Sequence, residues 1–467
     1  MNQRINIKEL KTTHKDSADR FNPSKRIYVR AAYGLFQKLR RYTGAILILL
    51  FVSLPLIRWH GKQAVLFDVA KQQFHLFNMT LFPQDLTLLA WIFIIAAFAL
   101  FFVTTYLGRI WCGYTCPQTV WTFIFIWFEE RFEGSANKRK RLDQMPWNFN
   151  KIWRKTAKHT GWLLVSLLTA LVFCSYFVPV EQLYSDFFTL NSSPFILLCI
   201  FIFTFSTYAN AGWMRSIFCI HMCPYSRFQS AMFDKHTYSV AYDAKRGEQR
   251  GPRSRKVDPK KIALGDCVDC DLCVQVCPTG IDIRDGLQYE CINCGACVDA
   301  CDQTMDKMGY PRGLISYTSE QKLAGKETNL LRPKIIGYGL VLLIMMTIFV
   351  VNIVNLSTAE MEIVRDRTAL YRENSEGLIE NTYTLKILNK TIETQTYQLS
   401  IMGLQDALLI GPEQIVVKSG EVLTQPIAIA VDPYNIKEKK RMITIILTKK
   451  EGDFEQIKQQ SPFFLGL

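Results

Sequence analysis

The stretch CVDCDLCVQVCPTGIDIRDGLQYECINCGACVDAC, residues 267–301, decides what this chain is built around. It holds eight of the fourteen cysteines, in two runs that share the spacing C-x2-C-x2-C-x3-C. This spacing is typical of bacterial ferredoxins with two [4Fe–4S] clusters, because three closely spaced thiolates wrap one cluster and the fourth reaches its neighbour. The pattern therefore predicts a dicluster ferredoxin module of the α+β class.

The fourth cysteine of each run is expected to serve the other cluster. Two structural zinc sites are the alternative, and the duplication of the whole run makes that interpretation the weaker one. Asp302 follows the second run where the pattern usually has proline, which loosens the turn without removing a ligand. The first cluster is assigned to Cys267, Cys270, Cys273 and Cys301, and the second to Cys277, Cys291, Cys294 and Cys297.

The composition indicates a membrane protein with water-exposed parts. A chain of 467 residues is long enough for two or three domains, and it is 49% hydrophobic yet 21% charged. An extracellular disulfide scaffold is not expected, since cluster ligands need a reducing compartment and no cysteine follows Cys301. Residues 1–41 are polar and basic without an apolar core, so they do not resemble a secretory signal.

Five segments are apolar enough to be transmembrane helices. The clearest, residues 86–108, contains no charge, and its 23 residues would extend about 34 Å as a helix, enough to cross the hydrocarbon core. Buried helices of a soluble protein are the alternative, and five such segments argue against it. The predicted spans are residues 42–57, 86–108, 161–180, 194–212 and 335–356.

The loop charges predict how these spans are oriented. The net charge is +8 for residues 1–41, +6 for 109–160 and +3 for 213–334, whereas residues 59–85 are neutral and 181–193 carry −2. Positively charged loops stay in the cytoplasm. The N-terminus and the cysteine runs are therefore predicted to be cytoplasmic, and the C-terminal region periplasmic.

After residue 357 the pattern changes to short alternating or β-branched segments separated by Gly, Pro, Asn and Asp, which is typical of a small β-sandwich. This region has no catalytic motif, so we interpret it as an interaction or stabilising module.

The basic run Lys245–Lys261 favours contact with anionic lipid headgroups, with a solvated linker as the alternative. The predicted domains are a basic tail (1–41), a membrane region with four spans (42–234), a ferredoxin domain (235–334), a fifth span (335–356) and a β-sandwich (357–467).

Two further cysteine motifs follow the second and fourth spans at their cytoplasmic ends. They read RIWCGYTCP at 109–117 and RSIFCIHMCP at 215–224, so each places an arginine before a C-x3-C-P pair. The proline pushes the preceding cysteine out of the α region and is suited to open the next helix. Each motif is therefore expected to form a turn at the membrane face. The four thiols that we expect to share a space are those of Cys112, Cys116, Cys219 and Cys223.

Thiolates at such a site select Cu(I), zinc or iron–sulfur. His221 and Met222 flank the second pair and could add donors, and the alternative is four cysteines that merely pack at helix ends. The apolar stretch 119–128 is too short to span a membrane and is expected at its interface. Cys174 and Cys199 lie inside spans and are expected to be packing residues.

The chain resembles the cytochrome c oxidase accessory protein family, CcoG, also called FixG or RdxA. The resemblance is carried by four features in this order: WCGYTCPQTVW (111–121), CIHMCPYSRFQ (219–229), the double cluster run and the β-sandwich tail. The resemblance covers nearly the whole chain. It implies that the four C-x3-C-P cysteines are copper or redox residues and that the tail is Ig-like. It also implies a protein of the bacterial cytoplasmic membrane that reduces Cu(II) to Cu(I) for maturation of a cbb-type oxidase.

The leading hypothesis is a membrane-bound iron–sulfur oxidoreductase that reduces copper for oxidase assembly. Its expected partners are membrane lipid, the cbb-type cytochrome c oxidase or its copper-delivery factors, and an unidentified electron donor. A second hypothesis is an electron-transfer subunit to a quinone or a periplasmic reductase, since membrane polyferredoxins of the NapH and NosR type share the C-x3-C-P motif. A third is a non-catalytic assembly scaffold. Nucleic acid is not an expected partner, and a homodimer is left open.

Overall fold

The structure, a computed structural model, describes residues 27–255, 263–366, 368–391, 393–435, 438–450 and 456–464. Most of the basic tail predicted for residues 1–41 lies outside the described residues, as do the last six residues, 256–261, of the basic run Lys245–Lys261. The chain divides into two compact units. The cluster unit comprises Met1–Leu50, Ala96–Leu171 and Ser193–Leu342, and the sandwich unit comprises Phe51–Ile95, Val172–Ser192 and Leu343–Leu467.

Five helices are long and apolar enough to cross a membrane, as the sequence predicts. In the second and fifth helices almost none of the apolar residues are buried, so their Leu, Ile and Phe side chains point outward, as lipid-facing side chains do. The third begins at Phe149, well before the predicted residue 161, because a basic segment extends the same helix. Their bounds are Leu35–Leu56, Pro83–Leu107, Phe149–Cys174, Pro194–Met214 and Pro333–Val354.

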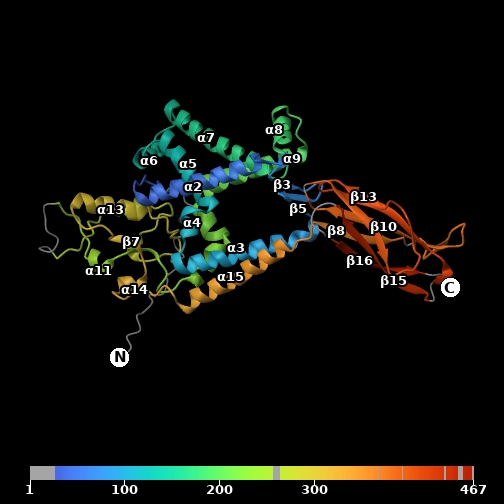
Figure 1. Cartoon of the computed structure of the whole chain (residues 1–467). Helices are drawn as coiled ribbons and strands as arrows, with labels where there is room; N and C mark the ends of the chain where they lie inside the picture. The colour runs from blue at the N-terminus through green and yellow to red at the C-terminus, as the bar shows by residue number, and fades with distance from the viewer. Residues whose placement is uncertain are drawn as a thin grey trace. The chain divides into compact units, whose positions relative to one another are not determined.

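The helices of the cluster unit pack through aromatic and small residues. Gly339 of α15 faces Phe102 of α3, where an added Cβ would lie 3.3 Å from the ring, and the two helices run side by side (Figure 1). The main helices of the chain are α2 (Leu35–Ser53), α3 (Leu86–Leu107), α4 (Ile110–Tyr114), α5 (Pro117–Phe132), α6 (Ala136–Gln144), α7 (Phe149–Cys174), α8 (Val180–Phe188), α9 (Pro194–Ala209), α10 (Pro224–Phe228), α13 (Ala296–Met308) and α15 (Pro333–Val354).

The short apolar stretch 119–128 forms most of α5, which packs on α7. The ring of Phe125 stacks on Trp162 with centroids 5.1 Å apart, and the indole N–H of Trp162 donates to the carbonyl oxygen of Phe125 at 3.0 Å. The indole N–H of Trp121 donates to Thr169 Oγ1 at 2.8 Å. Helix α5 is therefore a fixed part of the bundle, and it positions the first C-x3-C-P motif at its own N-terminus.

The ferredoxin domain is closed by one antiparallel strand pair, β6 (Ser239–Tyr242) with β7 (Ile315–Thr318). Both cysteine runs lie between these strands in the sequence. Val240, Met305 and Leu314 form the core together with several of the cysteines. The pairing of distant strands thus encloses six of the eight cysteines in one apolar core, whereas Cys270 is exposed.

The sandwich consists of two antiparallel sheets, as predicted, with strand orders β12–β14–β10–β8 and β13–β11–β15–β16 (Figure 1). Along β10, Tyr383, Leu385 and Ile387 are fully buried and alternate with more exposed residues, which is the period-two pattern seen in the sequence. The strands are β8 (Ala359–Arg365), β9 (Arg372–Glu373), β10 (Ile379–Asn389), β11 (Gln395–Met402), β12 (Leu408–Ile410), β13 (Gln414–Val417), β14 (Val422–Val431), β15 (Lys440–Lys449) and β16 (Gln456–Phe464).

A small sheet between the first two spans was not predicted. Strands β3 (Val65–Asp68), β4 (Gln73–Leu76) and β5 (Met79–Leu81) form it, and it belongs to the sandwich unit. Gln73 donates to the carbonyl oxygen of Gly420 at 2.8 Å, and Lys390 forms a buried ion pair with Asp85 at 2.8 Å. The loop is therefore docked on the sandwich by specific polar contacts.

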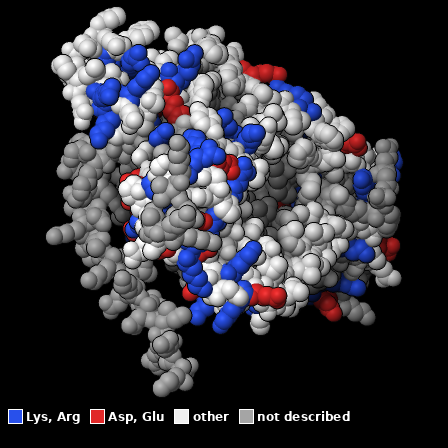
Figure 2. Space-filling model, turned by 90° about the vertical axis from the view of Figure 1, so that its left-hand side faces the viewer, with Lys and Arg blue, Asp and Glu red and all other residues white. Residues whose placement is uncertain are grey.

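Basic side chains are prominent on the outside of the cluster unit. Helix α6 exposes Lys138, Lys140 and Arg141, and only Arg139 of its basic run is buried. On the face drawn in Figure 2, Lys and Arg side chains (blue) are spread widely among uncharged residues. This distribution matches the positive charge of the loops that the sequence predicts to face the cytoplasm.

Candidate electron-transfer site

Two small cavities of equal size lie inside the ferredoxin domain, each with a volume of about 20 Å³. Cys273 lines both, so the cavities adjoin. The structure places each predicted set of four thiols around its own cavity. The first is lined by Cys267, Cys270, Cys273 and Cys301, and the second by Cys277, Cys291, Cys294 and Cys297 together with Cys273.

The donor chemistry of these cavities fits iron–sulfur clusters. Within the described ranges, no three His, Cys, Asp or Glu side chains are placed to hold a single metal ion, whereas four thiols around an enclosed space suit one thiolate per iron of a cube. Burial raises the pKa of Cys273 and Cys301 to about 12, so both are neutral thiols unless a bound cation stabilises the thiolate.

The two runs share a backbone feature that the spacing alone did not reveal. Asp269 and Asp271 flank the second cysteine of the first run, and Asn293 and Gly295 flank the second cysteine of the second run. All four have positive φ, between 51° and 70°. Asp, Asn and Gly are the residues that tolerate this left-handed conformation. The chain thereby curls around each cavity. The Asp, Asn and Gly residues beside the second cysteine of each run are the sequence feature from which this left-handed turn could have been predicted.

A buried arginine secures the first run. The Arg284 side chain is 7% exposed and forms ion pairs at 2.6 Å with Asp269, Asp271 and Asp282. Burial opposes ionisation of Asp282, but its hydrogen bonds with Arg284 hold the pKa of that carboxyl below its usual value. Arg284 was not predicted from the sequence. The cysteine spacing does not show that a residue that follows the first run contacts the aspartates within that run.

The C-x3-C-P motifs fold alike. Cys116 (φ −63°, ψ 126°) and Cys223 (φ −75°, ψ 115°) are extended, and the prolines that follow them open α5 and α10, as predicted. The first cysteine of each motif differs from the expected turn: Cys112 lies in α4, and Cys219 lies in the π-helix η5 (Phe218–Met222). Each pair therefore joins the end of one helix to the start of the next.

The structure places the four C-x3-C-P thiols near one another, although no three of these four described residues are positioned to hold a single metal ion. Cys112 interacts electrostatically with Cys116, Cys219 and Cys223, and all four are half-buried. Burial, with the neighbouring thiols adding to it, raises the pKa of Cys112 and Cys219 to about 12. His221 and Met222 are both exposed.

The arginine of each motif binds the other repeat. Arg109 is buried and donates to the carbonyl oxygen of Ser226 at 3.2 Å, just beyond the second motif. Arg215 pairs at 2.7 Å with Glu129 of α5, the helix that follows the first motif. This reciprocal exchange holds the two cysteine pairs against each other, and it explains why both motifs carry an arginine.

The first C-x3-C-P motif packs against the loop that lines the second cavity. Cys112 lies in one apolar cluster with Ile292 and Cys294. A Cβ added to Gly113 would lie 2.9 Å from the carbonyl oxygens of Ile292 and Asn293, so the two backbones touch. The four-thiol site and the second ferredoxin cavity are therefore neighbours.

Comparison with known proteins places this chain in a family. It is 36% identical to protein RdxA of Cereibacter sphaeroides, over 82% of this chain and 83% of the relative. It is 33% identical to nitrogen fixation protein FixG of Rhizobium meliloti, over 83% of this chain and 81% of the relative. The chain belongs to the FixG/RdxA family. The FixG/RdxA resemblance noted from the motifs is thereby confirmed.

Family models agree with the FixG/RdxA assignment. A "4Fe-4S dicluster domain" matches residues 214–320, a "4Fe-4S binding domain" matches 89–132, and the "IG-like fold at C-terminal of FixG" matches 349–466. A crystal structure of a FixG-related protein from Vibrio parahaemolyticus is 38% identical and covers 24% of this chain and all of that one, with a TM-score of 0.23. This FixG/RdxA member is thus an iron–sulfur electron-transfer protein with an Ig-like C-terminal domain.

Proposed function

We propose that this chain reduces Cu(II) to Cu(I) at the site formed by Cys112, Cys116, Cys219 and Cys223, and that the Cu(I) serves assembly of a cbb-type cytochrome c oxidase. The proposal includes the ligand sets given above for the two ferredoxin cavities. The observation that carries it is the packing of Cys112 against the Cys294 loop. This contact places the thiol site next to residues that themselves line the cavity.

The four-thiol site has the chemistry that copper reduction requires. Thiolates are soft ligands and favour Cu(I). Conversion of Cu(II) to Cu(I) consumes one electron, and a bound [4Fe–4S] cluster supplies one electron at a time. Burial raises the pKa of Cys112 and the Arg109 guanidinium only partly opposes this, so the positive charge of the copper substrate would itself favour the thiolate that holds it.

The loop charges support a location for each part. We infer that the N-terminus and the cavities face the cytoplasm of a bacterium and that the sandwich faces the periplasm, with the five helices in the cytoplasmic membrane. A cytoplasmic ferredoxin domain would keep its thiols reduced. Its redox partners would then be cytoplasmic or membrane-borne.

A second candidate function is electron transfer without copper chemistry. It is favoured by the family model at residues 89–132, which carries the description "4Fe-4S binding domain" and contains Cys112 and Cys116. On this interpretation the four thiols would hold iron, and the chain would serve a quinone or a periplasmic reductase.

The deciding experiment uses the full chain purified without oxygen. The clusters are reduced with dithionite, excess reductant is removed, Cu(II) is added, and Cu(I) is followed with a Cu(I)-specific chelator while cluster absorbance is recorded. We expect about two Cu(I) per chain, one for each cluster, and a large loss of rate in Cys112→Ser and Cys219→Ser. Cys199→Ser is the matched control, since Cys199 is also half-buried but lies in α9 outside the site.

Three results would count against the proposal. If reduced clusters yield no Cu(I), the chain is not a copper reductase. If the wild type and the Cys112→Ser and Cys219→Ser variants react at equal rates, the four thiols are not the copper site. About twelve irons per chain, rather than the eight of two [4Fe–4S] clusters, would assign the four thiols to iron and favour the second candidate.

A further inference from the structure

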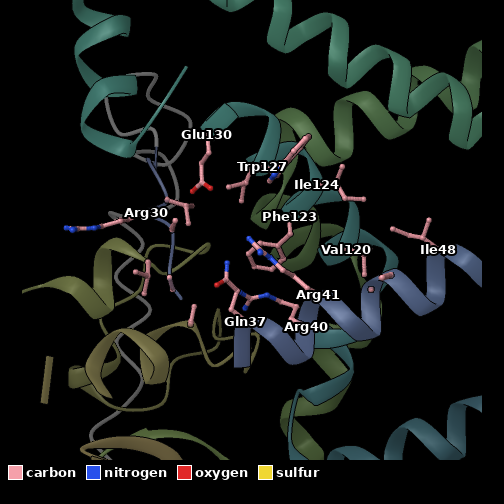
Figure 3. Close-up of a pocket in the computed structure, with 18 residues that line it drawn as sticks. Arg30, Gln37, Arg40, Arg41, Ile48, Val120, Phe123, Ile124, Trp127 and Glu130 are labelled. Atoms are coloured by element: carbon pink, nitrogen blue, oxygen red, sulfur yellow. The ribbon is translucent and has the colours of Figure 1, made fainter. Parts of the chain in front are cut away.

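A pocket of about 430 Å³ lies between α2 and α5 in the cluster unit (Figure 3). Its walls are mainly apolar, and Phe123 and Trp127 contribute aromatic faces. A volume of this size suits a small organic molecule. The apolar wall is made by Ile48, Val120, Phe123, Ile124, Ile126 and Trp127.

The pocket extends along α2 from Arg40 to Ile48, a rise of about 12 Å. Leu35–Leu56 is one of the candidate membrane spans, so the Ile48 end lies within apolar helix and the Arg40 end lies near its polar terminus. Small residues, Gly44 and Ala45, line the stretch between them and leave room beside the helix. Trp127 is 51% exposed at the pocket. The Trp127 side of the pocket is therefore open, and with α2 as a membrane span this opening would admit the apolar tail of a lipid-soluble ligand.

The polar end of the pocket is tied to the second cavity. Arg40 is 8% exposed, its guanidinium lies 4.0 Å above the ring of Phe123, and its Nη1 donates to the carbonyl oxygen of Cys294 at 2.9 Å. Val276 and Ala296 also line the pocket, and they are the immediate neighbours of Cys277 and Cys297. The pocket thus adjoins the second cluster cavity through two residues and one buried cation.

A carboxylate faces the same space. Figure 3 shows Glu130 of α5 pointing into the pocket, with Gln37 and Arg40 on the side of α2. Burial raises the pKa of Glu130, and Glu129 adds to this, while Arg139 and Arg41 oppose it. Glu130 is therefore placed to take up a proton from a molecule in the pocket.

We propose that this pocket binds the headgroup of an isoprenoid quinol, and that the quinol is the electron source of the chain. The pocket combines a bilayer entrance, an aromatic wall, polar groups at one end and contact with a cluster cavity. The inference rests on the iron–sulfur function of the chain and does not depend on copper reduction.

The reaction balances within the site. Oxidation of a quinol to a quinone breaks two O–H bonds and releases two electrons and two protons. Two clusters held by the thiols of the two cavities would each accept one electron, which matches the two electrons. One proton goes to the Glu130 carboxylate and the other to water at the polar end, where Arg41 is exposed.

Binding is tested first, in the oxidised full chain in detergent, with decylubiquinone as the probe and calorimetric titration as the readout. Ala45→Trp fills the pocket, and we expect it to weaken binding about tenfold or more. Ile46→Trp is the matched control, because Ile46 is 59% exposed on the same helix and does not line the pocket. It should bind like the wild type.

Electron entry is tested next, by adding decylubiquinol anaerobically and following the bleaching of cluster absorbance by stopped flow. Glu130→Gln should slow bleaching and flatten its pH dependence while decylubiquinone affinity is kept. Glu320→Gln, an exposed carboxylate of α14 (Glu320–Leu323), should leave the rate unchanged.

Equal affinity in the wild type and Ala45→Trp would overturn the proposal. Phospholipid that copurifies with the wild type, is lost in Ala45→Trp and is not displaced by decylubiquinone would overturn it too, since the pocket would then be a lipid site. Failure here is separable from failure of copper reduction. Dithionite-reduced Ala45→Trp protein should still convert Cu(II) to Cu(I), because that route bypasses the pocket.

Discussion

Gly113 packs against the carbonyl oxygen of Asn293: a Cβ added at residue 113 would lie only 2.9 Å from it. Gly113 is the residue after Cys112 in the first C-x3-C-P motif, and Asn293 lies between Cys291 and Cys294. The contact joins the first C-x3-C-P motif to the loop of the second cavity. A glycine is needed there because the neighbouring atoms are backbone and cannot rotate away.

Replacing Gly113 with alanine should separate the two sites. We expect Gly113→Ala to cost about 1 to 3 kcal/mol of stability, because the extra methyl forces one backbone to shift. Electron transfer from the clusters to Cu(II) should slow, with the spectrum of the second cluster changed and that of the first retained. Gly337→Ala is the control, since nothing lies within 4 Å of that position. A normal copper reduction rate in Gly113→Ala would show that the contact is not used.

Cys277 and Cys301 should each affect the cluster of the other run. Cys277 belongs to the first run but lines the second cavity, and Cys301 belongs to the second run but lines the first. Cys277→Ser should therefore perturb the same paramagnetic signal as Cys291→Ser, and Cys301→Ser the same signal as Cys270→Ser. Electron paramagnetic resonance of the reduced variants checks this. If Cys277→Ser instead perturbs the same paramagnetic signal as Cys270→Ser, each run does not supply its fourth cysteine to the other cluster.

Iron removal should unfold the ferredoxin domain while the sandwich stays folded. The cysteines are part of the domain core, together with Val240, Met305 and Leu314, so an empty domain is left with unfilled cavities lined by thiols. The sandwich has a core of its own that contains no cysteine. After oxidation and chelation of iron, limited proteolysis should cut between residues 239 and 318 and spare 379–449. Equal protection of both regions would be the contrary result.

Neutralising Glu129 should strongly destabilise the bundle. Glu129 is 2% exposed and pairs with Arg139, which is also 2% exposed, and with Arg215. Glu129→Gln leaves buried arginines without this opposing charge, at a cost of about 3 to 5 kcal/mol. Asp306→Asn is the control, because its pair with Arg312 is at the surface and should contribute little. Denaturant midpoints of the two variants in detergent provide the comparison.

The sandwich unit should lose stability in mild acid through His75. Burial, followed by the charge of Lys62 and then Lys71, lowers the pKa of His75 below its usual 6.5, with Asp68 opposing. The unfolded chain therefore binds the proton more readily. Stability should be fully present above about pH 6.5 and fall as the pH passes down through the lowered pKa. His75→Gln should remove this dependence in calorimetric scans between about pH 5 and 8. An unchanged pH profile in the variant would exclude His75 as its source.

Most residues of the candidate site could be predicted from the spacing of the cysteine motifs. The eight ferredoxin cysteines and the four C-x3-C-P cysteines were selected from the sequence, and the prolines correctly predicted the extended cysteines and the helices that follow them. Arg284, Arg40 and Gly113 were missed. Their roles depend on contacts with residues far away in the chain, and a lone arginine or glycine has no local pattern that reveals such a partner.

The sequence by itself determined the family, the five apolar helices, the two cluster runs and the sandwich, because hydrophobic length, period-two alternation and ligand spacing are local properties of the chain. Only the tertiary structure decided which thiols share a space, that Cys112 packs against residues that line the second cavity, and that a pocket opens between α2 and α5. Those relationships arise where Arg109 binds Ser226 and Arg40 binds the carbonyl of Cys294. They are contacts between segments more than a hundred residues apart, which packing alone brings together.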